Sequence, residues 1–175
     1  MQHDFHPVDV LNKKGEIIGH KPRKNIDKLV DIFHTIHILL VTPVGEIVMS
    51  IIPLREDLPN IYANKLGTTV ATIRRTDETD DEAASRAIAR ELFIDDMPLT
   101  KLGTKFYHRL PPTPGSLFSV YYGIADVPES YSMIDIEGLI VMTPKEIDNL
   151  IETDPHSLAY SFLKVWKDYK DKLPL

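Results

Sequence analysis

The segment ETDDEAASRAIARELFI, residues 78–94, carries the clearest local signal in the chain. Acidic residues crowd its beginning and arginines lie toward its end, as the helix dipole favours. Its apolar residues repeat with the i, i+4, i+8 spacing of one helical face, and they are Ala84, Ile88 and Leu92. The pattern predicts a helix over residues 78–93, capped by Thr76 or Asp77.

Shorter segments on both sides of this helix predict strands. They are rich in Val, Ile and Thr, and turn residues separate them. The expected strands are residues 8–11, 16–19, 34–42, 47–52, 101–109, 116–125 and 136–142, and residues 66–75 are expected to be a strand or an irregular extended segment. Further helices are expected over residues 22–31, from Thr143-Pro144 onward, and over 154–170. Strands on both sides of a central helix indicate an α+β fold in a single domain, residues 1–175.

Composition excludes several classes of function. The chain has 175 residues and no cysteine, which excludes a disulfide scaffold, a thiolate zinc site and a cysteine nucleophile. Lys and Arg total 20 against 26 Asp and Glu, a formal net charge of -6. An acidic chain is a poor binder of nucleic acid or of an anionic membrane. No targeting signal or long apolar run is present, so we expect a cytoplasmic protein without nucleic-acid or membrane partners.

Residues 72–94 resemble the loop–helix–loop box of the Nudix (MutT-like) superfamily. That box reads Gly, five residues, Glu, seven residues, and then Arg-Glu-apolar-any-Glu-Glu-any-Gly-apolar. When Arg86 is placed on the box arginine, Glu78 falls on the first box glutamate. The structural box residues are then Arg86, Ile88 and Ile94.

The box is degenerate, because two of its three metal-binding carboxylates are absent. Ala87 and Arg90 fill two of these positions, and only Glu91 keeps a carboxylate. Thr72 and Phe93 stand where the box has glycines. A guanidinium at position 90 repels a metal ion and attracts a phosphate or a carboxylate instead.

A second register lies one helical turn further along the chain. It takes Glu82 as the box glutamate and Arg90 as the box arginine, and it restores two acids, Glu91 and Asp95. It also places Met97-Pro98 where the box has Gly-apolar. We prefer the first register because its flanking residues fit the box better.

The resemblance covers most of residues 8–169 and points to a Nudix subgroup close to isopentenyl diphosphate isomerase. The shared features are an N-terminal hairpin (about residues 7–20), His34, the pair Asp135 and Glu137, and the helix start Thr143-Pro144-Lys145-Glu146. That isomerase uses a cysteine, and this chain has Ala71 at the corresponding position and Ile73 in place of a metal-binding histidine. An isomerase-like activity is therefore a minor alternative.

The resemblance implies an α/β/α sandwich with a mixed sheet. The box helix would cover one face, and the C-terminal helices (about residues 144–171) would cover the other. It implies a hydrolase that cuts a diphosphate linkage, in a nucleoside-diphosphate-linked or related substrate, with Mg²⁺ or Mn²⁺ as cofactor. The alternative is a catalytically inactive Nudix-fold protein that binds a phosphorylated ligand. A homodimer is compatible with the resemblance, since dimers are common in the superfamily.

The resemblance also assigns roles to individual residues. Glu91 is expected to be the main metal ligand and a catalytic residue, with Glu137 as the general base. Glu78 is expected to be a further metal ligand and to steady the turn before the helix. The candidate substrate-binding residues are arginines that could clamp a phosphate: Arg55, Arg74, Arg75 and Arg90.

Overall fold

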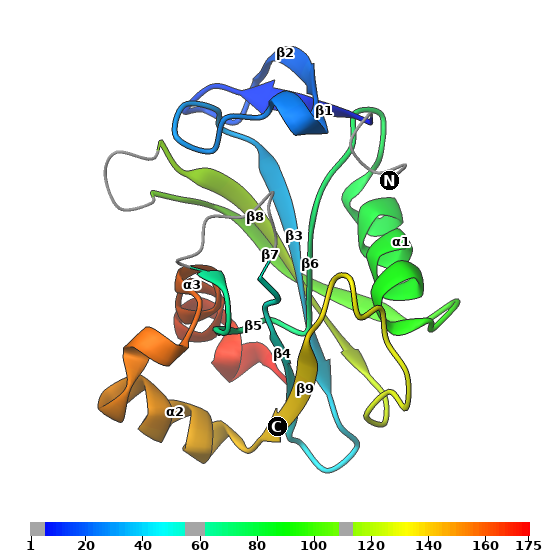
Figure 1. The fold of residues 1–175 in the computed structure, drawn as a ribbon, viewed down its shortest axis with the longest axis vertical. Coiled ribbons are helices and arrows are strands. Elements are labelled where there is room, and N and C mark those ends of the chain that lie inside the picture. The colour runs from blue at the N-terminus through cyan, green and yellow to red at the C-terminus, as the bar shows by residue number, and fades with distance from the viewer. Residues whose placement is uncertain (1–5, 55–61, 109–113) are drawn as a thin grey trace.

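A mixed seven-stranded sheet forms the centre of the structure, and helices cover both of its faces (Figure 1). The computed structural model describes residues 6–54, 62–108 and 114–175. Its elements are β1 (Pro7–Leu11), β2 (Ile17–Pro22), η2 (Arg23–Asn25), β3 (His34–Val41), β4 (Ile47–Ile51), β5 (Leu66–Gly67), β6 (Val70–Ile73), α1 (Asp80–Leu92), β7 (Leu99–Tyr107), β8 (Ser116–Ile124), β9 (Gly138–Met142), α2 (Pro144–Thr153), η4 (Pro155–Ser157), α3 (Tyr160–Tyr169) and η5 (Lys170–Lys172). The structure is a single domain of the α+β class with the layers that the sequence predicted.

Strand β3 organises the sheet because it pairs with three other strands. It runs antiparallel to β4 and β6 and parallel to β8. Every residue of β3 is buried, including the polar residues His34, Thr35 and His37. Its side chains alternate between the two faces of the sheet. Ile36, Ile38 and Leu40 pack toward α1, whereas Leu39 and Val41 pack toward α3.

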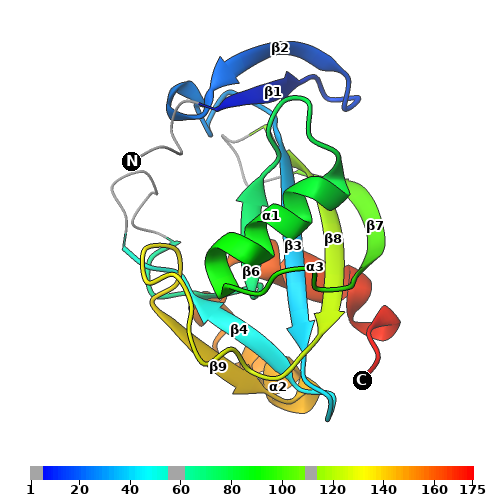
Figure 2. The same ribbon diagram turned by 90° about the vertical axis from the view of Figure 1, so that its right-hand side faces the viewer.

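Helix α1 lies across one face of the sheet, over β3 and β6 (Figure 2). Its N-cap is Thr79, not the expected Thr76 or Asp77. Thr79 and Glu82 form a capping box, in which the Thr79 N–H donates to the Glu82 carboxylate at 2.7 Å and the Glu82 N–H donates to the Thr79 hydroxyl. This reciprocal pair fixes the start of the helix slightly later than predicted.

Helices α2 and α3 cover the opposite face of the sheet. Helix α2 begins as the sequence indicated, with Thr143 as its N-cap and Pro144 in its first turn. The apolar side of α3 carries Phe162, Val165 and Trp166 into the core. Among the described residues, none of the helices combines the length and the apolar character that crossing a bilayer requires.

Three predicted elements are shorter than expected. The predicted helix over residues 22–31 is reduced to the 3₁₀ turn η2, and the extended segment predicted over residues 66–75 is split into β5 and β6. The predicted final helix, 154–170, opens with the 3₁₀ turn η4, and its α-helical part begins only at α3. The Ala159 N–H donates to the Leu66 carbonyl at 2.8 Å, so this part of the chain bonds to the sheet before it turns into α3.

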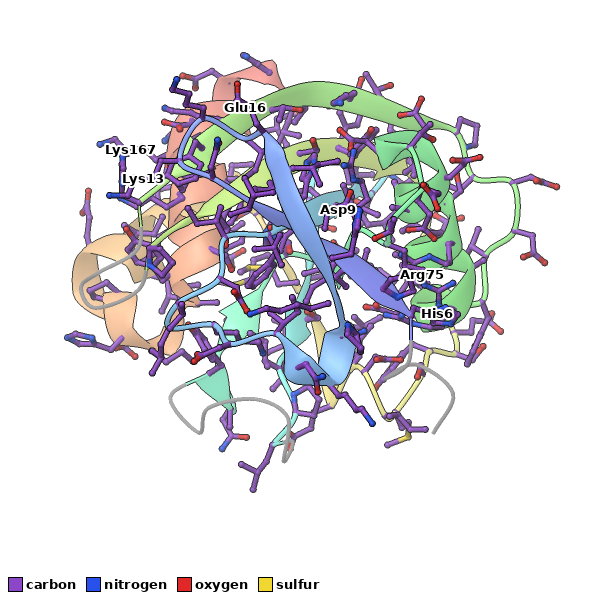
Figure 3. The ribbon with its side chains drawn as sticks, turned by 90° about the horizontal axis from the view of Figure 1, so that it is seen from above. His6, Asp9, Lys13, Glu16, Arg75 and Lys167 are labelled. Atoms are coloured by element: carbon purple, nitrogen blue, oxygen red, sulfur yellow. The ribbon has the colours of Figure 1, made fainter. Side chains whose placement is uncertain are left out.

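The β1–β2 hairpin lies across one end of the molecule, and the buried carboxylate of Asp9 connects it to the loop before α1 (Figure 3). Asp9 accepts a hydrogen bond from Thr76 Oγ1 at 2.8 Å, and it lies 2.9 Å from His20 Nδ1 and 3.4 Å from Arg74 Nη2. Thr76 and Arg74 belong to the loop before α1. Asp9 therefore joins the hairpin to the segment that begins the box helix.

The residue that follows α1, Phe93, stands where the Nudix box has a glycine, and its backbone adopts a conformation that favours glycine. Phe93 is the C-cap of α1 and adopts the left-handed conformation, with φ 56° and ψ 32°. A side chain in this conformation costs roughly 1 kcal/mol relative to glycine. The Phe93 ring is largely exposed and recovers little of that cost by packing.

Replacing Phe93 with glycine is therefore expected to stabilise the protein by roughly 1 kcal/mol. Urea unfolding of the wild type and of Phe93→Gly measures the difference. Phe93→Ala is the matched control, because it removes the same ring but keeps the Cβ atom. A Phe93→Gly protein no more stable than Phe93→Ala would show that the left-handed cap carries no strain.

Candidate functional site

A cavity of about 220 Å³ opens beside β6, between the C-terminal end of α1 and the start of α3. Its apolar wall includes Phe33, Ile52, Pro53, Tyr62, Phe118 and Tyr160. Hydroxyl groups and charged side chains complete it, and the charged residues are Arg23, Lys28, Arg90, Glu91 and Asp135. An apolar wall with a few convergent polar groups is typical of a small-molecule site.

Arg90 lies between two carboxylates of this cavity. Its Nη2 donates a hydrogen bond to Glu91 Oε1, and its Nε lies 3.7 Å from Asp135 Oδ2. The Glu91 side chain is only 5% exposed, and that of Asp135 is 17% exposed. Because water is largely excluded, these charges interact more strongly than surface ion pairs do. The three side chains form a single ion-paired cluster at the end of α1, which we call the Arg90 cluster.

The segment before β9 brings Asp135 into the cavity and leaves Glu137 outside it. The Ser132 N–H donates to the Glu91 carbonyl at 2.8 Å, and Ser132 Oγ donates to Asp135 Oδ2 at 2.8 Å. Glu137 is exposed and is not among the residues that line the cavity. The structure therefore supplies Asp135, rather than the expected general base Glu137, to the cavity.

Strand β3 contributes His37 to the cavity, a residue with no role predicted from the sequence. His37 Nε2 lies 3.2 Å from Thr35 Oγ1, and its Nδ1 lies 3.3 Å from Thr68 Oγ1. Its ring centroid is 4.3 Å from that of Phe118. Alternation along the strand could have found it, because Thr35 and His37 have the opposite parity to the α1-facing residues.

Glu78, just before the N-terminus of α1, forms a bidentate ion pair with Arg86 of the helix. Arg86 Nε and Nη2 donate to the two Glu78 oxygens at 2.6 and 2.8 Å, and Nη2 also lies 3.3 Å from the Ile73 carbonyl. Burial disfavours the charged carboxylate, but hydrogen bonds from Arg86 and from the Arg75 N–H outweigh it and lower the pKa of Glu78. Glu78 does not line the cavity that holds Glu91, and Arg86 binds both of its carboxylate oxygens, so the cavity does not bring the two expected metal ligands together.

The four candidate substrate-binding arginines have different surroundings. Arg90 lines the cavity, whereas Arg74 and Arg75 do not. Arg74 bridges two carboxylates beneath the hairpin, at 3.1 and 3.4 Å, and Arg75 is ion-paired in the loop before α1. Arg55 lies outside the described residues.

His34 lies on the α1 side of the sheet, away from the cavity. Its Nε2 is 2.9 Å from Ser119 Oγ, and its Nδ1 is 3.7 Å from Asp80 Oδ1. Burial lowers the pKa of His34 to about 4, although the charge of Asp80 opposes this shift. Burial also disfavours the charged form of Asp80, but hydrogen bonds from Lys101 and Ser119 outweigh it and lower the pKa of Asp80 to about 2.

The isomerase-like positions are only partly gathered at the cavity. Ala71 and Ile73 line it, opposite His37 and Thr35 in the β3–β6 ladder. Both are apolar, so this face has none of the ligands that the isomerase-like alternative needs there. Within residues 6–54, 62–108 and 114–175, no three His, Asp or Glu side chains are placed to share a metal ion.

The fold of this chain is similar to the folds of several solved structures. No family model matches the chain, and no curated protein matches it either. The crystal structure of DR0079 from Deinococcus radiodurans superposes with a TM-score of 0.76 at 19% identity, covering 93% of this chain and 99% of that one. A MutT/Nudix family protein from Listeria innocua gives a TM-score of 0.59 at 18% identity, covering 80% and 92% of the two chains.

A third similar structure is the dihydroneopterin triphosphate pyrophosphohydrolase of E. coli. It gives a TM-score of 0.58 at 13% identity, and the match covers 81% of this chain and 99% of that one. A second solved structure of DR0079 is described as that of a hypothetical Nudix protein. The chain therefore has the Nudix fold, the fold of the MutT-like hydrolases.

Proposed function

We propose that this protein hydrolyses a diphosphate linkage in a small phosphorylated molecule with the help of a divalent metal ion. The observation that carries this proposal is the position of two carboxylates, Glu91 and Asp135, on the cavity wall of a Nudix fold. A likeness of fold alone supports a class of protein and not a reaction, so the proposal depends on this site.

The two carboxylates suit a magnesium ion. In sites that act on phosphates, Mg²⁺ is commonly held by one or two carboxylates together with phosphate oxygens of the substrate. Glu91 and Asp135 would be the protein ligands. When bound, the ion would neutralise charge that develops on the phosphate oxygens.

Other cavity residues supply what a substrate needs besides the metal ion. Arg90 can bind phosphate oxygens with its guanidinium group. Asp135 and His37 are cavity groups that can accept a proton from an attacking water. The apolar wall that contains Phe33 and Phe118 can cover the part of the substrate that carries no phosphate.

A second candidate function is binding without cleavage. The observation that favours it is Arg90, which stands at a position where the Nudix box has a carboxylate and pairs with the two cavity carboxylates, Glu91 and Asp135. A protein of this kind would bind a phosphorylated ligand equally well in the presence of a chelator.

A phosphate-release panel tests the two candidates. The substrates are nucleoside triphosphates, nucleotide sugars, dinucleoside polyphosphates and prenyl diphosphates, each with Mg²⁺, with Mn²⁺ and with EDTA. We expect turnover of at least one class that disappears in EDTA. Binding of these compounds by the folded protein in EDTA, without turnover in either metal, would contradict the hydrolase and support the binding protein.

A further inference from the structure

The Arg90 cluster has an unusual charge arrangement for a site that handles phosphate. One guanidinium group contacts two carboxylates, and Arg23 and Lys28 add two further basic side chains to the lining of the same cavity. The Arg90 side chain is itself 19% exposed, so it is held in the wall and does not extend into solvent. While Arg90 pairs with Glu91 and Asp135, its positive charge opposes a divalent cation at the same two carboxylates.

The same wall contains two buried polar atoms without a hydrogen-bond partner in the part of the chain that the structure describes. They are Arg90 Nε and Thr72 Oγ1. Thr72 is only 5% exposed, and both residues line the cavity. Buried polar groups are nearly always hydrogen-bonded. Both atoms can donate a proton, so together they suit a ligand rich in oxygen acceptors, such as a phosphoryl group.

Helix α1 presents Arg90 on the side that faces β6, the strand that carries Thr72. Arg86 Nη2 lies 3.3 Å from the carbonyl of Ile73, which follows Thr72 in β6. Arg90 is one helical turn after Arg86 and therefore lies on the same side of α1. The helix face that carries both arginines thus runs along β6.

We propose that Arg90 exchanges partners when substrate binds. Its guanidinium group releases Glu91 and Asp135 and binds a phosphoryl group, to which Thr72 also donates a hydrogen bond. The two carboxylates then become available to the metal ion, so binding of the phosphoryl group favours binding of the metal. This inference rests on the proposed function and specifies how its two ligands are coupled. It makes Arg90 a positioning residue for the metal and a binding residue for the phosphate.

The proposal predicts opposite effects of one substitution on two ligands measured separately. In Arg90→Ala without any phosphate compound, Mn²⁺ affinity, measured by electron paramagnetic resonance, is expected to rise at least tenfold. Inorganic pyrophosphate affinity in EDTA, measured by calorimetry, is expected to fall at least tenfold. Thr72→Val is expected to weaken pyrophosphate in the same way and to leave Mn²⁺ affinity unchanged.

Matched controls separate these effects from changes in charge or folding. Lys167→Ala removes an exposed cation of α3, and Thr100→Val removes an exposed hydroxyl of β7, and neither should alter either affinity. Arg90→Lys keeps the charge and should keep Mn²⁺ binding weak. Arg90→Met keeps the aliphatic stem and replaces Arg90→Ala if circular dichroism shows that the alanine variant is unfolded.

Two results would overturn the exchange. One is an Mn²⁺ affinity that does not rise when the guanidinium is removed. The other is a pyrophosphate affinity in EDTA that does not depend on Arg90 and Thr72, whatever happens to Mn²⁺. The affinities do not require turnover, so a protein that shows both opposite effects but cleaves nothing supports the exchange while contradicting the hydrolase.

Discussion

Glu91→Gln is expected to lower metal-dependent turnover by about 100-fold or more. The substitution keeps the size of the side chain and an oxygen that can accept the hydrogen bond from Arg90 Nη2. It removes the negative charge of Glu91, the one carboxylate present at the three positions that correspond to metal-binding residues of the box. Initial rates with the best substrate of the panel, with Mg²⁺ and with Mn²⁺, measure the effect.

The matched control is Glu152→Gln on the exposed side of α2, which should retain full activity. Glu137→Gln is a separate test of the general base expected from sequence. Because Glu137 is exposed outside the cavity, we expect it to cost less than about threefold, well below the effect of losing a general base. Unchanged turnover in Glu91→Gln would exclude the α1 carboxylate from the reaction, and a large loss in Glu137→Gln would restore the sequence-based assignment.

The second large effect is on stability and comes from His34. Its pKa is about 4 in the folded protein and 6.5 in an exposed histidine. The unfolded chain therefore binds a proton between these values that the folded protein does not. Stability is highest above pH 6.5 and falls as the pH is lowered toward 4, by about 3 kcal/mol in total for this one group.

Urea unfolding at half-unit steps between pH 7 and pH 4.5 measures this loss. The carboxylates of Glu78 and Asp80 have lowered pKa values, so their contribution is lost only at more acidic pH. His34→Gln removes the titrating group, and its free energy of unfolding should vary much less over the same range. An equal slope in the wild type and in His34→Gln would assign the loss to another group.

Local patterns predicted most of the fold. The i, i+4, i+8 spacing identified α1, and Thr143-Pro144 identified the start of α2. The error in the cap of α1 is local, because the Thr79 and Glu82 capping box was overlooked, but another error arises where a contact distant in sequence decides the outcome. The helix expected over residues 154–170 is interrupted because Ala159 bonds to Leu66, a partner that no local pattern reveals.

The site was predicted less well because it depends on which face a side chain occupies. Glu91 and Arg90 were expected on the box helix, and the structure places both in the cavity wall. Of the two histidines of β3, His34 was predicted from the sequence as a possible site residue, whereas His37 is the one that lines the cavity. Asp135 and Glu137 are two residues apart and would share one face of a strand. Asp135 instead lies in the turn that begins at Ser132, and it lines the cavity whereas Glu137 does not. A turn has no repeating sequence pattern that would predict this difference.

The parallel pairing of β3 with β8 has a consequence for how the chain assembles. It joins residues 34–41 to residues 117–124, about 80 positions later in the chain. During synthesis, β3 can acquire its hairpin partner β4 and then β6, but its other edge waits until β8 has emerged. An exposed edge of an apolar strand is a place where chains pair wrongly. The interval between the synthesis of these two strands is therefore the period in which the growing chain depends most on protection from aggregation.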